Sequence, residues 1–368
     1  MEYKFKRLRE NEFSIGDYVL IAVTITLMIL GLVTLRSVVW GTEQQGRFTK
    51  QIIWDLVSLG IMLYIIFEKE VRIKKYGKYF YVLSVALLVL VLLIGKIVYG
   101  ARRWIDIGPF DLQPSELFKI SIILLLSEVL SHAPQGKKFL YSLFVVLPVV
   151  LVFLEPDLGM TVLILFLWFV MMMSSNINRK YILAILIIGV ISAPILFYTV
   201  LKDYQRARIL ALFNPQEHFQ YGAYNTIMSQ VAIANGGIFG TGYNLGIATN
   251  MHMVPMQYTD FIFSAYAEQF GLVGSLILVG LYGTIILLSM IKIEKYKDEY
   301  WRYVVTGANC VFAFHVFENI GMNLGILPVT GIPLPFMSYG GTSTLVFSML
   351  VGLLVKARAI SKIARPVG

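Results

Sequence analysis

Charged residues are scarce in this sequence. Only 14% of its 368 residues are Asp, Glu, Lys or Arg, whereas 57% are hydrophobic; a soluble domain carries about 25% charged residues. Apolar runs near 20 residues, such as "YFYVLSVALLVLVLLIG", have no polar face, and this excludes a large soluble helical core. The chain is therefore predicted to be an all-α, polytopic integral membrane protein.

Cysteine is nearly absent. The one cysteine, Cys310, can form no intrachain disulfide, and its apolar surroundings predict a small buried side chain. No histidine and carboxylate spacing typical of a zinc site occurs.

The net charge of +9 could suggest nucleic acid as a partner, but in a membrane protein lysine and arginine mainly set the orientation. No nucleic-acid partner is expected.

The apolar runs predict about ten transmembrane helices. These spans are 17–40, 51–68, 79–98, 114–132, 139–154, 158–175, 181–201, 259–291, 302–322 and 338–358. The first is too long for the core of a signal peptide and is interpreted as a retained helix. The eighth exceeds the thickness of a bilayer, so it must tilt, bend or project.

Lysine and arginine are distributed unevenly between the two sides of these spans. If the N-terminal tail, residues 1–16, is cytoplasmic, 21 of the 31 lie on the cytoplasmic side, which puts both termini inside. The longest extracellular loop, 202–258, then joins the seventh and eighth spans. Within it, "AYNTIMSQVAIA" predicts an amphipathic helix in the membrane interface. The whole chain, 1–368, is predicted to be a single transmembrane domain.

The unusual polar residues lie in the predicted extracellular loops. Arg102 and Arg103 stand beside Trp104, either as an interfacial belt or as a clamp on phosphate. Arg206 and Arg208 in "YQRARI" add positive charge on the same side, where the positive-inside rule does not explain it. This favours an anionic ligand outside the membrane.

Glu116 and Lys119 in "QPSELFK" share one helix face at i, i+3. One interpretation is a buried ion pair that only holds helices together. The other is that Lys119 supplies positive charge to an anionic substrate group while Glu116 orients it. In "PDLG", Asp157 either caps the sixth span or lines a cavity.

Two further groups of residues have open interpretations. His315, Glu318 and Asn319 share a face of the ninth span, as a proton relay or, more commonly, as a hydrogen-bond cluster between helices. The glycines of "ANGGIFGTGYN" resemble a phosphate-binding loop but follow no strand, so they are interpreted as a flexible turn.

Asp260 and Glu268 stand at the start of the eighth span, in "MQYTDFIFSAYAEQFG". Glu268 is about 12 Å deeper and rotated by about 80°, so the two carboxylates do not form a close acid/base pair. Glu268 is interpreted as a buried structural carboxylate. Either Thr259 or Asp260 caps the helix, or Asp260, being near water, acts as a general base on an extracellular substrate.

These segments together resemble the SEDS family (shape, elongation, division and sporulation), the RodA- and FtsW-type peptidoglycan glycosyltransferases. "GARRWIDIGPFDLQPSELFKI", "PDLG", "YQRARILALFNP", "DFIFSAYAEQFG" and "NLGILPVTGIPLPFMSYGGTS" occur in the order and spacing of the family, closer to RodA than to FtsW. Departures from the family pattern are Glu155 and Glu318, where glutamine is usual, and Gln269, where glutamate is usual.

The resemblance implies polymerisation of lipid II at the extracytoplasmic face of the bacterial cell membrane, during cell elongation. It also implies a class B penicillin-binding protein as transpeptidase partner. The family's catalytic aspartate maps onto Asp260, and its functional glutamate and lysine map onto Glu116 and Lys119.

This activity predicts roles for the polar residues. Asp260 would take the proton of the GlcNAc 4-hydroxyl of lipid II as its oxygen attacks C1 of the lipid-linked MurNAc. The positive charge for the undecaprenyl-diphosphate leaving group would come from Arg102, Arg103, Lys119 and Arg208. Further cavity-lining candidates are Asp157, Ser338 and Tyr339. No metal ligand is assigned, and a divalent cation, Mg²⁺ or Mn²⁺, is the candidate cofactor.

Two alternatives belong to other functional classes. A lipid II flippase or transporter would place functional polar residues at mid-membrane and on both faces, and a membrane scaffold for cell-wall enzymes would need no catalytic residue. The unusual polar residues crowd one face of the membrane, with Glu268, His315 and Glu318 as exceptions. This distribution favours the enzyme.

Overall fold

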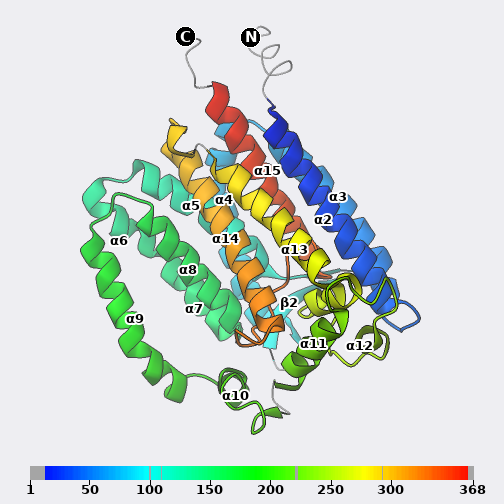
Figure 1. The fold of residues 1–368 in the computed structure, drawn as a ribbon. Helices are drawn as coiled ribbons and strands as arrows, with labels where there is room; N and C mark the ends of the chain where they lie inside the picture. Colours follow the sequence, from blue (N-terminus) through cyan, green and yellow to red (C-terminus); the bar gives the residue numbers. More distant parts are fainter. Residues whose placement is uncertain (1–12, 99–100, 109, 220–222, 292, 364–368) are drawn as a thin grey trace.

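The computed structural model describes residues 13–98, 101–108, 110–219, 223–291 and 293–363. Its long helices run side by side as one bundle, and the first and last described residues, 13 and 363, lie at the same end of it (Figure 1). The opposite end carries a small sheet and three shorter helices, and is called the loop end below.

Each of the ten predicted spans coincides with a helix or a run of short helices. They are α2 (Ile15–Val39), α3 (Gly46–Phe67), α4 (Glu70–Ile94), α5 (Pro114–His132), the run from η1 to α7 (Gln135–Leu154), α8 (Leu158–Met173), α9 (Arg179–Thr199), α13 (Ile262–Met290), α14 (Glu299–Asn323) and α15 (Gly341–Ile363). Within the described residues, seven of these are long and apolar enough to cross a membrane, and α8 is a shorter apolar helix. The all-α, multi-pass architecture is therefore confirmed.

The fifth span is not one continuous helix. It consists of η1 (Gln135–Lys137), α6 (Lys138–Ser142), η2 (Leu143–Val145) and α7 (Val146–Leu154). A further short turn, η4 (Ile293–Lys295), precedes α14.

The third span ends earlier than the sequence predicts. Gly95, in extended conformation, follows the last residue of α4, and the chain then forms β1 (Lys96–Val98), β2 (Ala101–Ile107) and β3 (Phe110–Leu112). These strands make an antiparallel sheet in the order β1-β2-β3. The helix predicted to residue 98 thus ends at Ile94, and the segment beyond it forms strands that pair with one another.

The helices α5, α14 and α15 form the centre of the bundle. Phe118, Phe312 and Phe347 are buried there, and α15 also packs along α3. By contrast, α9 stands at the edge (Figure 1), and only 6% of its most apolar 18-residue stretch is buried inside the protein. Its apolar side chains therefore face lipid.

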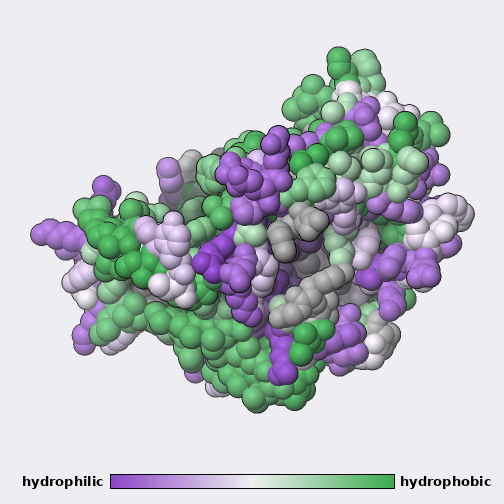
Figure 2. Space-filling model, turned by 90° about the horizontal axis from the view of Figure 1, so that it is seen from below, coloured by the Kyte–Doolittle hydropathy of each residue, from purple (hydrophilic) through white to green (hydrophobic). Residues whose placement is uncertain are grey.

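The segment 202–258 holds α10 (Asp203–Leu210), α11 (Ala223–Gly236) and α12 (Ile247–Asn250) at the loop end. The helix predicted from "AYNTIMSQVAIA" is present as α11, which packs against α13. Seen from below, hydrophilic residues gather over the middle of the loop end and extend to its right edge, whereas hydrophobic residues cover the lower edge (Figure 2). The polar residues singled out in the sequence thus lie on elements that meet at this end.

Candidate active site

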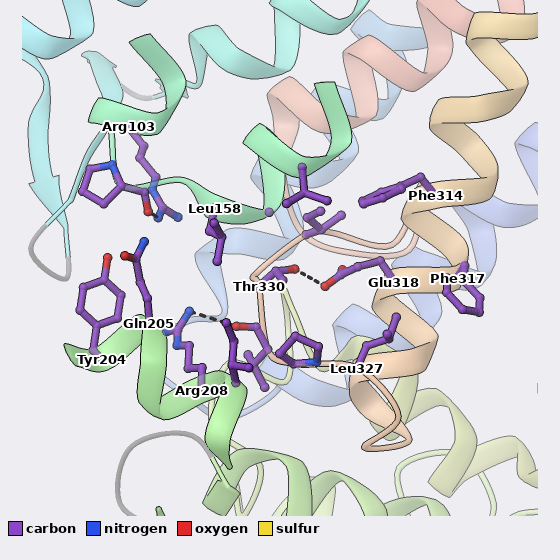
Figure 3. Close-up of a pocket in the computed structure, with 17 residues that line it drawn as sticks. Arg103, Leu158, Tyr204, Gln205, Arg208, Phe314, Phe317, Glu318, Leu327 and Thr330 are labelled. Carbon is purple, nitrogen blue, oxygen red and sulfur yellow. Dashed lines mark hydrogen bonds between the residues drawn. The ribbon is translucent and has the colours of Figure 1, made fainter. Parts of the chain in front are cut away.

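A cavity of about 350 Å³ lies among α8, α10, α14 and the segment 327–332 (Figure 3). One part of its wall is polar and consists of Arg103, Tyr204, Gln205, Arg208, Glu318 and Thr330. The rest is mainly apolar and includes Leu158, Val162, Phe314, Phe317, Leu327 and Ile332. The space is therefore amphiphilic, with its two arginines on the side away from Phe314 and Phe317.

Arg103 reaches the cavity from β2. Its Nε donates to the backbone oxygen of Glu155 at 3.2 Å, and its guanidinium also donates to the backbone oxygen of Pro156. Asp157 Oδ2 lies 3.6 Å from the same Nε. Arg102, the neighbouring strand residue, is exposed, donates to the backbone oxygen of Leu92 and is not part of the cavity wall. The structure thus separates the two arginines, because successive side chains on a strand point to opposite faces.

Arg208 enters the cavity from α10. Its Nη1 donates to the backbone oxygen of Val329 at 3.2 Å (Figure 3). Its guanidinium lies 5.7 Å from the centre of the Tyr204 ring. Burial lowers the pKa of Arg208, and the negative charge of Asp260 opposes that change. The two residues therefore lie close enough to interact electrostatically.

Asp260 lies in the turn that precedes α13. Neither it nor Thr259 caps the helix, since α13 starts after Phe261 and has no side-chain cap bond. A Cβ placed on Gly331 would lie 3.5 Å from Asp260 Oδ2, so the carboxylate faces the chain between two residues of the cavity wall, Thr330 and Ile332.

The surroundings of the Asp260 carboxyl act on its pKa in opposite directions. The side chain is partly exposed, yet the protein packed around it removes much of its hydration. This desolvation raises the pKa of Asp260, whereas the guanidinium groups of Arg208 and Arg103 lower it. A carboxylate in such a place can accept a proton more readily than one in water.

The backbone of Asp260 is held by α14. Asn319 Nδ2 donates to the Asp260 carbonyl at 2.9 Å and Asn323 Nδ2 donates to the same oxygen at 3.0 Å. Asn319 also donates to the carbonyl of Ile332 at 2.8 Å. The hydrogen bonds predicted for this face of the helix are present, but these partners are backbone carbonyls outside the helices, and they tie Asp260 to the cavity wall.

Ser338 and Tyr339 support the same turn from the other side. Ser338 Oγ donates to the backbone oxygen of Thr259 at 2.7 Å, and the Tyr339 N–H donates to that of Tyr258 at 2.8 Å. The guanidinium of Arg47 lies 4.6 Å from the Tyr258 ring centre and 5.0 Å from that of Tyr339. Neither Ser338 nor Tyr339 belongs to the wall of the cavity described above.

Glu116 and Lys119 form the ion pair that their spacing predicts. Lys119 Nζ lies 2.7 Å from Glu116 Oε2, and both side chains are fully buried. Lys119 Nζ is also 2.9 Å from His315 Nε2, while His315 Nδ1 lies 2.9 Å from the carbonyl of Pro333. Since a carbonyl can only accept, Nδ1 carries the proton and Nε2 accepts from the lysine. The pair is outside the cavity wall, and its direct contact with substrate stays a prediction.

Asp157 caps α8, because its Oδ1 accepts from the Met160 N–H at 3.1 Å. Its other oxygen faces Arg103, as described above, and Gln113 Nε2 at 3.4 Å. The cap is therefore confirmed, whereas Asp157 only contacts Arg103 of the cavity wall and is not itself part of that wall. The preceding Glu155 is fully buried, and neither of its side-chain oxygens has a hydrogen-bond partner within the described chain.

Two other carboxylates have structural contacts. Thr330 Oγ1 donates to Glu318 Oε1, which ties α14 to the cavity wall (Figure 3). Glu268 is buried and accepts from the N–H groups of Ala248 and Thr249, both at 2.8 Å. Its partners are in α12, so Glu268 and Asp260 do not form a pair, as their helical geometry predicts.

Three contributors were not predicted from the sequence: Arg47, Gln113 and Asn323. Each acts across more than 40 residues of sequence, on Tyr258, Asp157 and Asp260 respectively. Among the residues that the structure describes, no three His, Cys, Asp or Glu side chains gather into a set that could hold a metal ion.

The chain is similar to known proteins over nearly its full length. Residues 17–363 match the family model of cell cycle proteins that comprises FtsW, RodA and SpoVE. The peptidoglycan glycosyltransferase MrdB of Escherichia coli K12 is 31% identical, with 94% of this chain and 95% of that protein covered. The peptidoglycan glycosyltransferase RodA of Treponema pallidum is 28% identical, with 93% and 97% covered.

Solved structures agree with these sequence relatives. A chain of a peptidoglycan synthase complex that coordinates polymerization and crosslinking superimposes with a TM-score of 0.78 at 28% identity, with 93% of this chain and 97% of that one covered. The rod shape determining protein RodA of Thermus thermophilus gives a TM-score of 0.69 at 26% identity, with 92% and 95% covered. Because the family model matches residues 17–363 and MrdB is 31% identical over nearly its whole length, this chain belongs to the FtsW, RodA and SpoVE family of cell cycle proteins.

Proposed function

We propose that this protein is a peptidoglycan glycosyltransferase that polymerises lipid II into glycan strands during cell elongation. The names of the relatives support the activity, and the likeness to RodA supports the role in elongation. The observation that carries the proposal is the amphiphilic cavity, in which two arginines face a wall of apolar side chains beside Asp260.

A lipid-linked sugar diphosphate matches this cavity in its chemistry. The planar guanidinium groups of Arg103 and Arg208 suit the oxygens of a diphosphate. Both are fixed by backbone carbonyls, so they need little reorganisation when an anion binds. The apolar side, with Phe314 and Phe317, suits the first isoprenoid units of the lipid. The remaining lipid would stay in the bilayer.

Asp260 acts as the general base in this proposal. It takes the proton of the GlcNAc 4-hydroxyl while that oxygen attacks C1 of the donor MurNAc. The new C1–O bond forms as the bond from C1 to the lipid diphosphate breaks, with inversion to a β-1,4 link. Arg103 and Arg208 stabilise the charge that develops on the diphosphate, and the proton on Asp260 then passes to water.

A divalent cation, Mg²⁺ or Mn²⁺, remains a proposal beside this mechanism. The described side chains provide no cluster of three ligands, so most ligands of such an ion would be diphosphate oxygens and water. The reaction above uses only the cations of the protein.

The setting of the enzyme is also proposed. The chain is a multi-pass membrane protein, and we place it in the cytoplasmic membrane with the loop end and the active site on the extracytoplasmic face. The excess of lysine and arginine on the other side supports this orientation. A class B penicillin-binding protein is the proposed partner, supported by the likeness to a chain of a peptidoglycan synthase complex.

The test is a polymerisation assay with purified protein, its transpeptidase partner and lipid II. Wild type should produce glycan strands, and Asp260→Asn should lose activity by about 100-fold or more while staying folded. Equal polymerisation by both would remove Asp260 from the mechanism. Movement of lipid II across liposome membranes without polymerisation would instead favour a flippase, and neither activity would favour a scaffold.

A further inference from the structure

The helix α13 is broken at Gly271, which has φ +66° and ψ −164°. A break of this kind leaves backbone groups without partners inside the helix. Here the N–H groups of Leu272 and Val273 donate instead to the carbonyls of Gly237 and Ile238, at 2.9 and 3.1 Å. The turn after α11 therefore replaces the missing helical hydrogen bonds.

The same turn also satisfies the carbonyls on the other side of the break. The N–H of Thr241 donates to the backbone carbonyl of Glu268 at 2.9 Å, and the N–H of Gly242 donates to the backbone carbonyl of Gln269 at 3.1 Å. A Cβ on Gly240 would overlap the carbonyl of Gln269, so glycine is required for this approach. The segment 237–242 is thus bound firmly to α13.

The position of the break along α13 indicates its depth in the membrane. The part from Gly271 to Met290 has about 20 residues and is about 30 Å long at 1.5 Å per residue, which equals the hydrocarbon thickness of a bilayer. This part alone is long enough to span the membrane, and a span that ends at Met290 leaves residues 262–270 beyond it. The break, and the turn bound to it, therefore lie at the boundary of the hydrocarbon at the loop end.

The tip of this turn is apolar and exposed. Ile238 is 60% exposed and Phe239 is 82% exposed, beside Leu272 at 54% and, one turn further along α13, Leu276 at 62%. The segment 236–242 contains no charged residue. The exposed side chains of α13 contact lipid, and the tip is continuous with them at the depth where the hydrocarbon begins.

We propose that residues 237–239 are a membrane-inserted tip, whose Ile238 and Phe239 side chains enter the lipid leaflet at the loop end. Its occupant is lipid rather than a second protein, because the patch continues the lipid-facing side of α13 and lies at the hydrocarbon boundary. The tip fixes the position of α11 relative to the bilayer. Through the bonds of Glu268 to Ala248 and Thr249, it also fixes the position of the chain that leads to Asp260.

Spin-label accessibility tests this directly, because Cys310 is the only cysteine of the chain. In a Cys310→Ala background, Phe239→Cys is labelled with a nitroxide and the full chain is placed in phosphatidylcholine–phosphatidylglycerol nanodiscs. Power saturation then compares collisions with oxygen, which concentrates in lipid, and with a water-soluble nickel chelate. Leu276→Cys serves as the lipid reference, and Gln216→Cys, exposed between α10 and α11, as the aqueous reference.

The label at position 239 should collide severalfold more with oxygen than with the nickel chelate, as at 276 and unlike 216. A label at 239 that matches 216 would show that the tip is in water and would overturn the proposal. Protection from both agents would show protein coverage and would overturn it as well. Ile238→Cys repeats the measurement should the first variant misfold. None of these outcomes depends on catalytic activity, so the result is independent of the proposed function.

Discussion

The side-chain amide of Asn319 lies 2.9 Å from the backbone oxygen of Asp260 and joins it to the cavity wall at Ile332. Asn319→Asp would place a carboxylate against two carbonyl oxygens and so displace the turn. We expect polymerisation to fall about 10-fold or more, because a loss of about 1.4 kcal/mol of transition-state stabilisation has that effect. Asn309→Asp, which disturbs bonds of the same helix to Ser289 and Val305, is the matched control. Equal losses in both variants would indicate general damage to α14.

Arg208 should set the pH dependence of the reaction. Its charge lowers the pKa of Asp260, which desolvation raises. A general base works when deprotonated, so activity rises with pH as Asp260 loses its proton. Arg208→Gln removes the lowering influence, and the acidic limb of the pH–rate profile should move to higher pH. Arg102→Gln should leave this limb in place, since Arg102 is outside the cavity. An unchanged limb in Arg208→Gln would argue against Asp260 as the titrating base.

The buried pair of Glu116 and Lys119 permits a test of its two interpretations. Lys119→Met leaves a buried carboxylate without its partner, which should lower stability by about 3 kcal/mol. The double variant Glu116→Gln/Lys119→Met removes both charges and should recover most of that loss, measured as the melting temperature in detergent. If polymerisation recovers with it, the pair is structural. If the stable double variant stays inactive, the positive charge of Lys119 serves the reaction.

Glu155 should make the protein more stable at lower pH. Burial raises the pKa of Glu155 from 4.5 to about 9, so the native chain holds a proton at neutral pH that the unfolded chain has lost. Stability is then fully present below about pH 4.5 and falls as the pH rises toward 9. Glu155→Gln is neutral at every pH, so its free energy of unfolding at pH 7 should exceed that of the wild type by at most about 3 kcal/mol.

The readout for Glu155 is the melting temperature at two pH values. Wild type and Glu155→Gln should melt alike near pH 5 and diverge near pH 8, with the variant higher. Glu217→Gln, an exposed carboxylate at the loop end, is the control and should show no such divergence. Parallel curves for wild type and Glu155→Gln would contradict a protonated native Glu155. A protonated carboxyl would also explain how glutamate replaces the glutamine that is usual in the family.

Local rules predicted much of this structure. Apolar runs located the helices, and the i, i+3 spacing paired Glu116 with Lys119. The cap at Asp157 also depends only on neighbours in sequence, and Cys310, which lies in an apolar run, is buried as predicted. Each of these features is determined within one or two helical turns, where hydropathy and spacing carry the information.

The features that the sequence did not reveal arise from contacts between distant segments. His315 meets Lys119 across 196 residues, and Asn319 meets Asp260 across 59. The break at Gly271 lies inside an apolar run that reads as continuous, and it depends on a turn some 30 residues earlier. The glycines of that turn, interpreted as flexible, are instead needed for close approach to α13.

The packing of α15 along α3 has a consequence for biogenesis. Gln51 of α3 donates to Thr344 of α15 at 3.0 Å and accepts from the N–H of Gly340 at 3.1 Å, across nearly 300 residues. At a synthesis rate of about 5–20 residues per second, α3 must wait about 15–60 s for this partner. The loop that supports Asp260 connects α14 to α15, so it is anchored only once α15 enters the membrane. We therefore expect the active site to be assembled only after α15 has been synthesised.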